Sequence, residues 1–167
     1  MGRKEHLERS KKSVNVAIVV VSDSKTKDTD ESGRIACGLL KKKGHSIVSR
    51  DLIGNDSNAI VSTMSRLTNR TDVDVILTIG GTGISKNDIT VDTLSPLLEK
   101  KLEGFGEMFR TMSFKQVGTG ALMSRSTAGV INRKVVLCVP GSTAAVELAV
   151  KRIIVPEIGH MVYEATR

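Results

Sequence analysis

The chain alternates apolar, β-branched runs with stretches in which apolar residues recur every three or four positions. Apolar runs of this kind predict buried strands, and helical spacing predicts helices between them. The predicted strands are Val14–Val21, Ser46–Ile53, Val73–Ile79 and Val135–Val139, the last preceded by Val130-Ile131 and a turn at Asn132-Arg133-Lys134. Helices are predicted over Ser32–Lys43, closed by Gly44, and from about Ser57 to Asn69, capped by Asp56.

The segments after Val73–Ile79 are shorter. Thr90 or Asp92 can start a short helix, and Ser95-Pro96 restarts it, because proline is favoured at the first helical position. We expect Gly104-Phe105-Gly106 to interrupt the helical pattern, and a new helix to run over Glu107–Phe114. Ser142 can cap another helix, and Val155–Arg167 continues as a last helical segment.

Alternating strands and helices predict βαβ units, and therefore a mostly parallel sheet with helices on both faces. The chain of 167 residues is long enough for one domain with a sizeable core. We therefore predict a single three-layer α/β/α domain over residues 13–167, preceded by a polar arm over residues 1–12.

Composition narrows the class of ligand. The formal net charge of +7 fits an anionic substrate or plain solubility. Aromatic residues make up only 2% of the chain, which argues against nucleic-acid binding by base stacking. Two cysteines, no CxxC pair and three histidines indicate neither a disulfide framework nor a structural zinc site. A reducing cytoplasm is therefore the compartment that we expect. No stretch approaches the run of about 20 apolar residues that a membrane span needs.

Polar residues follow several predicted strands at the point where each strand ends. They are Ser22-Asp23, Asp56, the segment Gly80–Asp88, and Pro140-Gly141-Ser142. The carboxyl ends of parallel strands share one edge of a sheet, where ligands bind. Three of these sets also have a purely structural interpretation, because Asp23 can form a turn and Asp56 and Ser142 can cap helices.

The segment Gly80-Gly81-Thr82-Gly83 fits neither GxGxxG nor GxxxxGK[ST], so neither a dinucleotide fold nor a Walker loop is supported. Three glycines in four residues after a strand nevertheless let backbone N–H groups approach an anion. Asp56 and Asp88 together could hold Mg²⁺, which takes few protein carboxylates and leaves positions for water and phosphate oxygens. No histidine lies near a nucleophile signature, so a catalytic triad is not supported.

Four segments in one order resemble the molybdopterin-binding domain family, the MoaB/MogA family that includes the gephyrin G domain. They are TIGGTGISKNDIT (Thr78–Thr90), LEGFGEMFRTMSF (Leu102–Phe114), GTGALMSRSTAGV (Gly118–Val130) and VPGSTAAV (Val139–Val146). VVVSDS together with ESGRI favours the MoaB branch. The resemblance implies an enzyme of molybdenum- or tungsten-cofactor biosynthesis that transfers AMP from Mg-ATP to the terminal phosphate of molybdopterin and releases pyrophosphate. It also implies a homotrimer, or a hexamer of paired trimers, and a possible handover to a metal-insertion protein.

The resemblance assigns roles residue by residue. Asp88 and Asp56 match the two essential carboxylates, suited to Mg²⁺ and the ATP phosphates. The matching substrate-binding positions are Gly80, Gly81, Thr82, Gly83, Gly141 and Ser142, with Glu107, Arg110 and Ser124-Arg125 in further family segments. Ser22 and Asp23 are substrate-binding candidates from their position after the first strand. Two alternatives remain open: a protein that holds or delivers molybdopterin or a nucleotide without turnover, and a scaffold.

Overall fold

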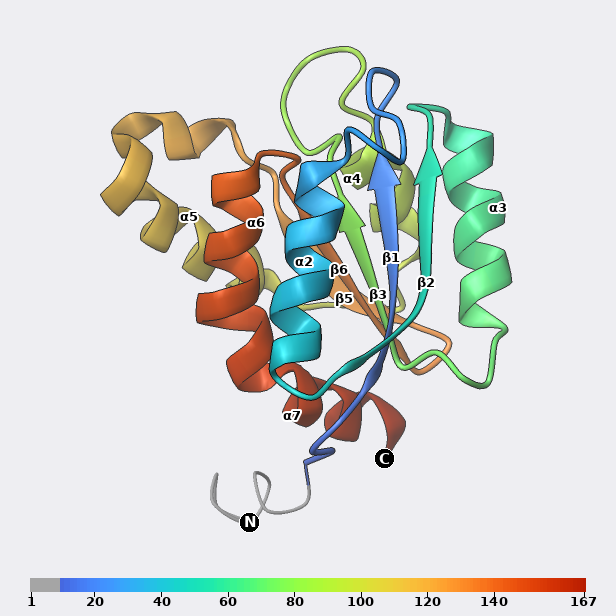
Figure 1. Cartoon of the computed structure of the whole chain (residues 1–167). Coiled ribbons are helices and arrows are strands. Elements are labelled where there is room, and N and C mark those ends of the chain that lie inside the picture. Colours follow the sequence, from blue (N-terminus) through green and yellow to red (C-terminus); the bar gives the residue numbers. More distant parts are fainter. Residues whose placement is uncertain (1–9) are drawn as a thin grey trace.

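The computed structural model describes residues 10–167, so most of the predicted arm, residues 1–9, lies outside the described part of the chain. The described residues form three layers (Figure 1). In chain order the regular elements are β1 (Asn15–Val21), α2 (Glu31–Lys42), β2 (Ser46–Ile53), α3 (Ser57–Thr68), β3 (Val75–Ile79), α4 (Thr90–Leu94), η1 (Ser95–Leu97), β4 (Lys100–Lys101), α5 (Glu103–Val117), η2 (Gly118–Met123), β5 (Thr127–Ile131), β6 (Lys134–Val139), α6 (Thr143–Ala149), η3 (Val150–Ile154) and α7 (Val155–Thr166).

The six strands form one sheet in the order β2-β1-β3-β6-β5-β4. Strands β2, β1, β3 and β6 run parallel, whereas β5 and β4 are antiparallel to their neighbours. The predicted three-layer architecture with a mostly parallel sheet is confirmed. Among the described residues, no helix is long and apolar enough to cross a membrane.

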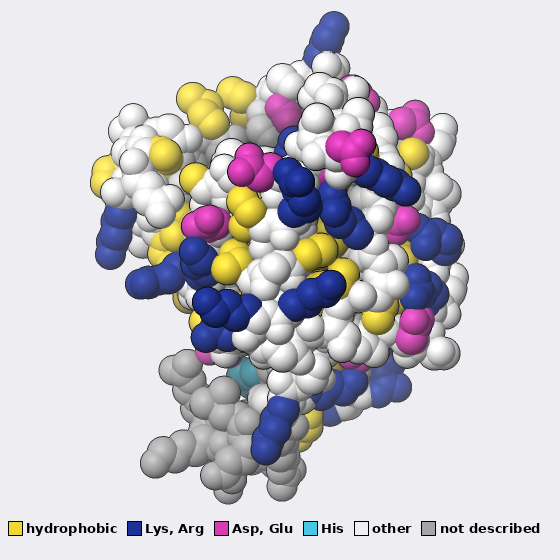
Figure 2. Space-filling view, in the orientation of Figure 1, with side chains coloured by type: hydrophobic (Ala, Val, Ile, Leu, Met, Phe, Trp, Pro, Cys, Tyr) yellow, Lys and Arg dark blue, Asp and Glu magenta, His cyan; other side chains and the backbone are white. Residues whose placement is uncertain are grey.

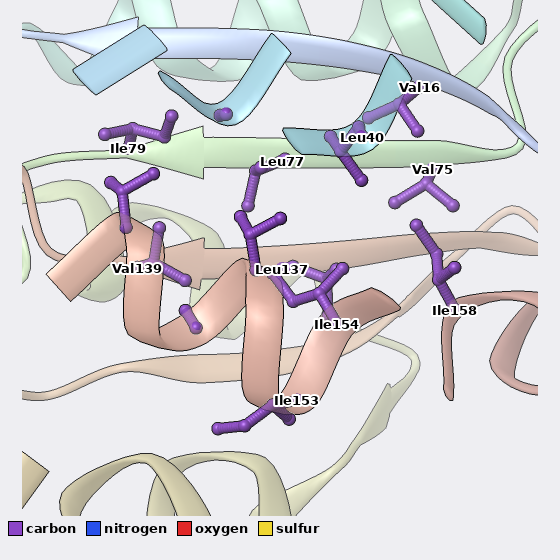
Figure 3. Packing of buried hydrophobic residues seen from close by; sticks show 14 of the residues in the cluster. Val16, Leu40, Val75, Leu77, Ile79, Leu137, Val139, Ile153, Ile154 and Ile158 are labelled. Atoms are coloured by element: carbon purple, nitrogen blue, oxygen red, sulfur yellow. The ribbon is translucent and has the colours of Figure 1, made fainter. Parts of the chain in front are cut away.

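The side chains of each central strand alternate between two apolar clusters. Val16, Ile18 and Val20 of β1 face the cluster built with α2, α5, α6 and α7. Ala17, Val19 and Val21 face the other cluster, built with α3 and α4. Figure 3 shows the first cluster at close range, where β3 residues such as Leu77 lie against α6 and η3 residues such as Ile154. A strand buried on both faces has no polar alternation, which is why β1, β3 and β6 have nearly continuous apolar sequences, whereas the partly buried edge strand β2 mixes polar and apolar residues.

One sequence expectation is wrong. Gly104-Phe105-Gly106 does not interrupt the chain, because α5 begins at Glu103 and runs through all three residues. Phe105 and Gly106 are buried, and a Cβ on Gly106 would overlap the carbonyl oxygen of Ser126. The glycine therefore permits close packing of the helix against the start of β5 instead of breaking the helix.

Candidate functional site

A cavity of about 670 Å³ opens at the carboxyl ends of β1, β3 and β6. In Figure 1 this is the upper edge of the sheet, where the arrowheads of β1 and β3 point, and the C-terminus lies at the opposite end. From β1 the chain continues to β2 on one side, and from β3 it continues toward β6 on the other. The cavity therefore lies at a topological switch point, where open α/β sheets bind ligands.

The glycine segment after β3 is shaped by close backbone contacts. Gly80 and Gly81 adopt positive φ angles of 106° and 68°. A Cβ on Gly80 would overlap the carbonyl oxygen of Val21, and one on Gly81 would overlap the side chain of Thr90. The N–H of Gly80 donates to the carbonyl of Val139 at 2.9 Å, so this group continues the sheet and is not available to a ligand. The predicted backbone contacts with an anion thus fall to the residues that follow Gly80.

Asp88 lies on the cavity wall, where the sequence placed it. Its Oδ2 accepts a hydrogen bond from the backbone N–H of Ser85 at 3.0 Å. Hydrogen bonding from Ser85 is the largest cause that lowers the pKa of Asp88; burial opposes it, while Gly83 and the Arg125 charge lower the pKa further. Asp88 is therefore an ionised carboxylate at neutral pH, as a ligand of a magnesium–phosphate complex must be.

Arg125 fixes the loop that carries Asp88. Its Nε donates to the carbonyl of Gly83 at 2.7 Å, and one terminal nitrogen donates to the carbonyl of Asp88 at 2.6 Å. Both terminal nitrogens also reach the carboxylate of Asp92, at 2.7 and 2.9 Å. Arg125 thus contacts both ends of the segment from Gly83 to Asp88. The sequence offered only its motif match, because nothing local connects residue 125 to residue 83.

Asp23 connects the loops that follow β1 and β2. It lines the cavity, and its carboxylate accepts hydrogen bonds from the backbone N–H and the side-chain amide of Asn55, at 2.8 and 2.9 Å. The side-chain bond from Asn55 is the main cause that lowers the pKa of Asp23. Ser22 also lines the cavity, and its Oγ accepts from the N–H groups of Ser24 and Lys25, both at 3.3 Å. The turn here is therefore formed by Ser22, and Asp23 acts as a bridge between loops.

Lys25 is a site residue that the sequence interpretation missed. It is the one Lys or Arg that the described chain contributes to the cavity lining. Its Nζ donates to Ser32 Oγ at 3.0 Å and to the carbonyl of Gly141 at 3.2 Å, which holds the cation against the loop after β6. The segment Lys25–Ser32 contains no apolar residue whose burial would have predicted the position of this side chain.

The same loop contains a buried carboxylate. Asp30 is only 1% exposed and caps α2 by accepting from the N–H of Gly33 at 2.9 Å. Arg50 donates to Asp30 Oδ2 through two nitrogens, at 3.2 and 3.0 Å. A buried carboxylate requires such partners, so this ion pair holds the loop between β1 and α2 against β2. The sequence feature that could have predicted this role of Asp30 is an Asp at the N-cap position just before the predicted helix.

The loop after β6 and the segment before β5 supply neutral polar groups. Gly141, Ser142 and Ser124 all line the cavity. Ser142 accepts from the N–H of Ala145 at 3.3 Å and so caps α6, which confirms its structural interpretation. The Oγ of Ser124 lies 2.8 Å from that of Ser126.

Four residues matched by the resemblance lie outside the cavity lining: Asp56, Glu107, Arg125 and Arg110, the last of which donates to the carbonyl of Ser124 at 3.3 Å. Asp56 is exposed and caps α3, accepting from the N–H of Ala59 at 2.7 Å, whereas its neighbour Asn55 lines the cavity. Glu107 is exposed on α5 and is not among the lining residues either. No group of three or more His, Cys, Asp or Glu residues able to hold a metal occurs in residues 10–167. Of the two predicted carboxylates, Asp88 lies in the cavity lining and Asp56 lies outside it.

The outer wall of the cavity comes from α5 and η2. The resemblance covered both segments, but Glu107 and Arg110 of α5, which it singled out, do not line the cavity, whereas Gly120 and Ala121 of η2 do. Phe109, Gln116, Val117 and Met123 complete this wall. The cavity thus combines an apolar side with an edge of hydroxyls, backbone groups and carboxylates.

The fold and the site together define a class: a three-layer α/β protein with a polar cavity at the switch point of its sheet. The cavity lining contributed by residues 10–167 contains no histidine or cysteine, so no Ser–His or Cys–His pair is present there. An ionised carboxylate, hydroxyls and one lysine suit the binding and charge neutralisation of a phosphate-bearing ligand.

Comparisons with known proteins agree with this class. A family model described as a probable molybdopterin binding domain matches residues 17–160. The molybdenum cofactor biosynthesis protein B of Bacillus anthracis is 43% identical over 164 residues, covering 98% of this chain and 97% of the relative.

Two solved structures extend the likeness. A crystal structure of a molybdenum cofactor biosynthesis protein B superposes with a TM-score of 0.89 at 43% identity, covering 92% of this chain and 96% of that one. The tungsten cofactor synthesizing protein MoaB from Pyrococcus furiosus gives a TM-score of 0.84 at 31% identity, covering 95% and 100%. The chain therefore belongs to the molybdopterin-binding domain family, the MoaB/MogA family of cofactor-biosynthesis proteins.

Proposed function

We propose that this protein acts in molybdenum or tungsten cofactor biosynthesis by transferring AMP from Mg-ATP to the terminal phosphate of molybdopterin. An oxygen of that phosphate attacks the α-phosphorus of ATP. The bond from the α-phosphorus to the oxygen bridging to the β-phosphate breaks, and pyrophosphate leaves with the bonding electrons. The names of the relatives from Bacillus anthracis and Pyrococcus furiosus support the pathway and leave both metals open.

The observation that carries the proposal is the placement of Asp88. Its carboxylate is ionised, lies on the cavity wall and is fixed on a loop that Arg125 contacts at both ends. Nucleotidyl transfer needs positioning and charge neutralisation more than a protein nucleophile, because the substrate's own phosphate attacks. A cavity without a nucleophile–base pair in its described lining is compatible with such a reaction.

Most of the predicted residues have a role in this proposal. Asp88 would hold the magnesium of Mg-ATP. Asp56 would contact the same Mg-ATP complex from the outer edge of the cavity. The loops around Gly81, Thr82 and Gly141 and the hydroxyls of Ser22, Ser124 and Ser142 receive molybdopterin. Lys25 balances phosphate charge at the loop after β6. Glu107 lies outside the cavity, and its assignment to substrate binding remains the least supported by position.

The test is product formation by purified protein from molybdopterin and Mg-ATP, measured as AMP-molybdopterin and pyrophosphate. Asp88→Asn removes the charge with little change in shape and should abolish the reaction while leaving molybdopterin affinity largely intact. Asp72→Asn is the matched control, because Asp72 precedes β3 at the opposite end of that strand and pairs with Arg70. Full activity in Asp88→Asn would refute the assigned role.

The alternative is a binding or delivery protein of the same pathway. It would hold molybdopterin or a nucleotide in the cavity without turnover. The two hypotheses separate in a single-turnover experiment: wild-type protein that binds molybdopterin but releases no pyrophosphate is not an adenylyltransferase.

We also propose that the protein is a homo-oligomer, either a trimer or a hexamer. Large apolar side chains on α5 and η2 are exposed, among them Phe114 at 58% and Leu122 at 75%. Large exposed apolar side chains on neighbouring elements are a common feature of protein–protein contacts. Charged substitutions at both positions, Phe114→Glu with Leu122→Glu, should lower the mass measured by light scattering to that of one chain. A similar pair of charged substitutions at Val61 on α3 and Ile84 on the loop after β3, which are also exposed, should leave the mass unchanged.

A further inference from the structure

A second hollow of about 410 Å³ lies between α5 and α6, next to the cavity. We call it the basic groove. Gln116 of α5 and Ala144 of α6 line both the basic groove and the cavity. Because the two hollows share these residues, one extended ligand can occupy both.

The basic groove and the cavity differ in charge. The groove is lined by Lys115, Lys151 and Arg152, against one carboxylate, Glu147, which pairs with Lys151 at 2.9 Å. The cavity has one cation, Lys25, against the ionised carboxylates of Asp23 and Asp88. Figure 2, in the orientation of Figure 1, shows Lys and Arg side chains spread over this face of the molecule, several of them at the left over the region of α6. The positive charge that a polyphosphate needs is therefore concentrated in the groove.

The backbone beneath two of these cations is unusual. Lys151 and Arg152 belong to η3, a π-helical turn between α6 and α7. Both are exposed, whereas Ile153 and Ile154 of the same turn are buried. π-Helical turns are rare and occur frequently at functional sites. The turn thus presents two adjacent cations to the groove while the chain keeps its apolar contacts with the core.

We propose that the basic groove binds the β- and γ-phosphates of a nucleoside triphosphate whose α-phosphate and nucleoside lie in the cavity. The inference rests on the proposed AMP transfer, because it assigns the place of the departing pyrophosphate. Several cations along one groove suit a chain of phosphates, each bound by charge-assisted hydrogen bonds. Because Gln116 and Ala144 border both hollows, the cavity and the groove are adjacent, as a continuous chain of phosphates requires.

The experiment compares ATP, pyrophosphate and AMP as separate probes, each with Mg²⁺, by isothermal titration calorimetry. The groove variant is Lys151→Gln with Arg152→Gln. Its matched control is Lys41→Gln with Lys42→Gln, which removes the same charge from two exposed neighbours at the end of α2. The groove variant should bind ATP and pyrophosphate about tenfold more weakly or worse and bind AMP within about twofold of wild type. The control should bind all three as wild type does.

Three results would overturn the proposal. Equal weakening of all three probes would mean that the pair acts through the fold. Equal weakening in the control would mean that net charge alone is responsible. Unchanged affinity for ATP and pyrophosphate would mean that phosphates do not enter the groove, and that its charge serves another partner, such as an acidic protein surface.

Product formation separates this proposal from the proposed reaction. If the groove variant shows the expected binding pattern but wild-type protein makes no AMP-molybdopterin, the proposed reaction is wrong and the proposed binding of phosphates in the groove is supported. If wild type makes AMP-molybdopterin and the groove variant keeps the same KM for ATP, the proposed role of the groove is wrong and the proposed reaction is supported.

Discussion

The loops after β3 and β2 each end a parallel strand and each carry a carboxylate, yet they differ in what they do with it. After β3, Asp88 lies on the cavity wall, on a loop held by Arg125. After β2, Asp56 is exposed and caps α3, while Asn55 binds Asp23. β3 is central, between β1 and β6, whereas β2 is the edge strand. In this sheet, the residues that line the cavity therefore follow mainly the central strands. The carboxylate that follows the edge strand β2 lies outside the cavity.

The largest expected effect compares the two carboxylates directly. In the adenylyl-transfer assay, Asp88→Asn should lower product formation by about 10²–10³-fold, as loss of a charge-stabilising group does in an active site. Asp56→Asn should lower it by about tenfold, because Asp56 reaches Mg-ATP only from the rim. Equal losses would mean that the loop after β2 moves into the cavity when Mg-ATP binds, and the comparison of the two loops would fail.

The next effect concerns the positioning of the β3 loop. Arg125→Met removes the bonds to Gly83, Asp88 and Asp92 without placing a new charge in the cavity. Product formation should fall by about 10–100-fold, since small displacements of a catalytic group cost that much. Arg125→Lys retains the charge and should recover only part of the loss, because lysine cannot make the same forked contacts. Complete recovery by lysine would show that charge, not positioning, is what Arg125 supplies.

A smaller effect separates capping from catalysis at Asp56. Asp56→Ala removes the acceptor for the N–H of Ala59 and should lower the free energy of unfolding by about 1 kcal/mol. Asp56→Asn keeps a good capping side chain and should change stability by only a few tenths. Urea denaturation measures both. If Asp56→Ala and Asp56→Asn are equally stable, the cap does not contribute to the free energy of unfolding. Any change in activity is then caused by the loss of the carboxylate charge.

The smallest effect is a pH dependence of stability that arises away from both loops. Burial lowers the pKa of His45, which lies just before β2. The unfolded chain therefore binds a proton more readily than the folded one. The contribution of neutral His45 to the free energy of unfolding is fully present above the unfolded pKa of about 6.5. It is lost as the pH falls through the lower pKa of the folded state.

The melting temperature should accordingly fall between pH 7 and pH 5, and His45→Phe should reduce that fall. Asp88 remains ionised through this range, because its pKa is lowered. An equal fall in His45→Phe would assign the pH dependence to other groups.

The sequence predicted the elements whose patterns are local. β2 occupies Ser46–Ile53 as expected, and the caps at Asp56 and Ser142 are present. The short edge strand β4 was missed, since two exposed lysines have no strand pattern. The run through Gly104 and Gly106 was misjudged because glycine's use in close packing depends on a partner, Ser126, that the sequence does not place.

The candidate site divides in the same way. Asp88, the glycine segment and Ser142 could be predicted because the ends of parallel strands converge. Lys25 and Arg125 could not, because their roles arise from contacts with Gly141 and Gly83, which are 116 and 42 positions away along the chain. Local pattern finds the loops of a site, whereas tertiary packing decides which side chains of those loops it uses.

The antiparallel pair at the far edge of the sheet has a consequence for how this fold can diversify. α5 and η2 leave the sheet at β4 and return at β5, where Lys101 pairs with Gly129 and Leu102 donates to the carbonyl of Ala128 at 2.8 Å. Their ends are thus joined by backbone bonds, so insertions or replacements between them leave the strand register intact. One wall of the cavity can be exchanged as a module while β1, β3 and β6 keep the opposite loops in place.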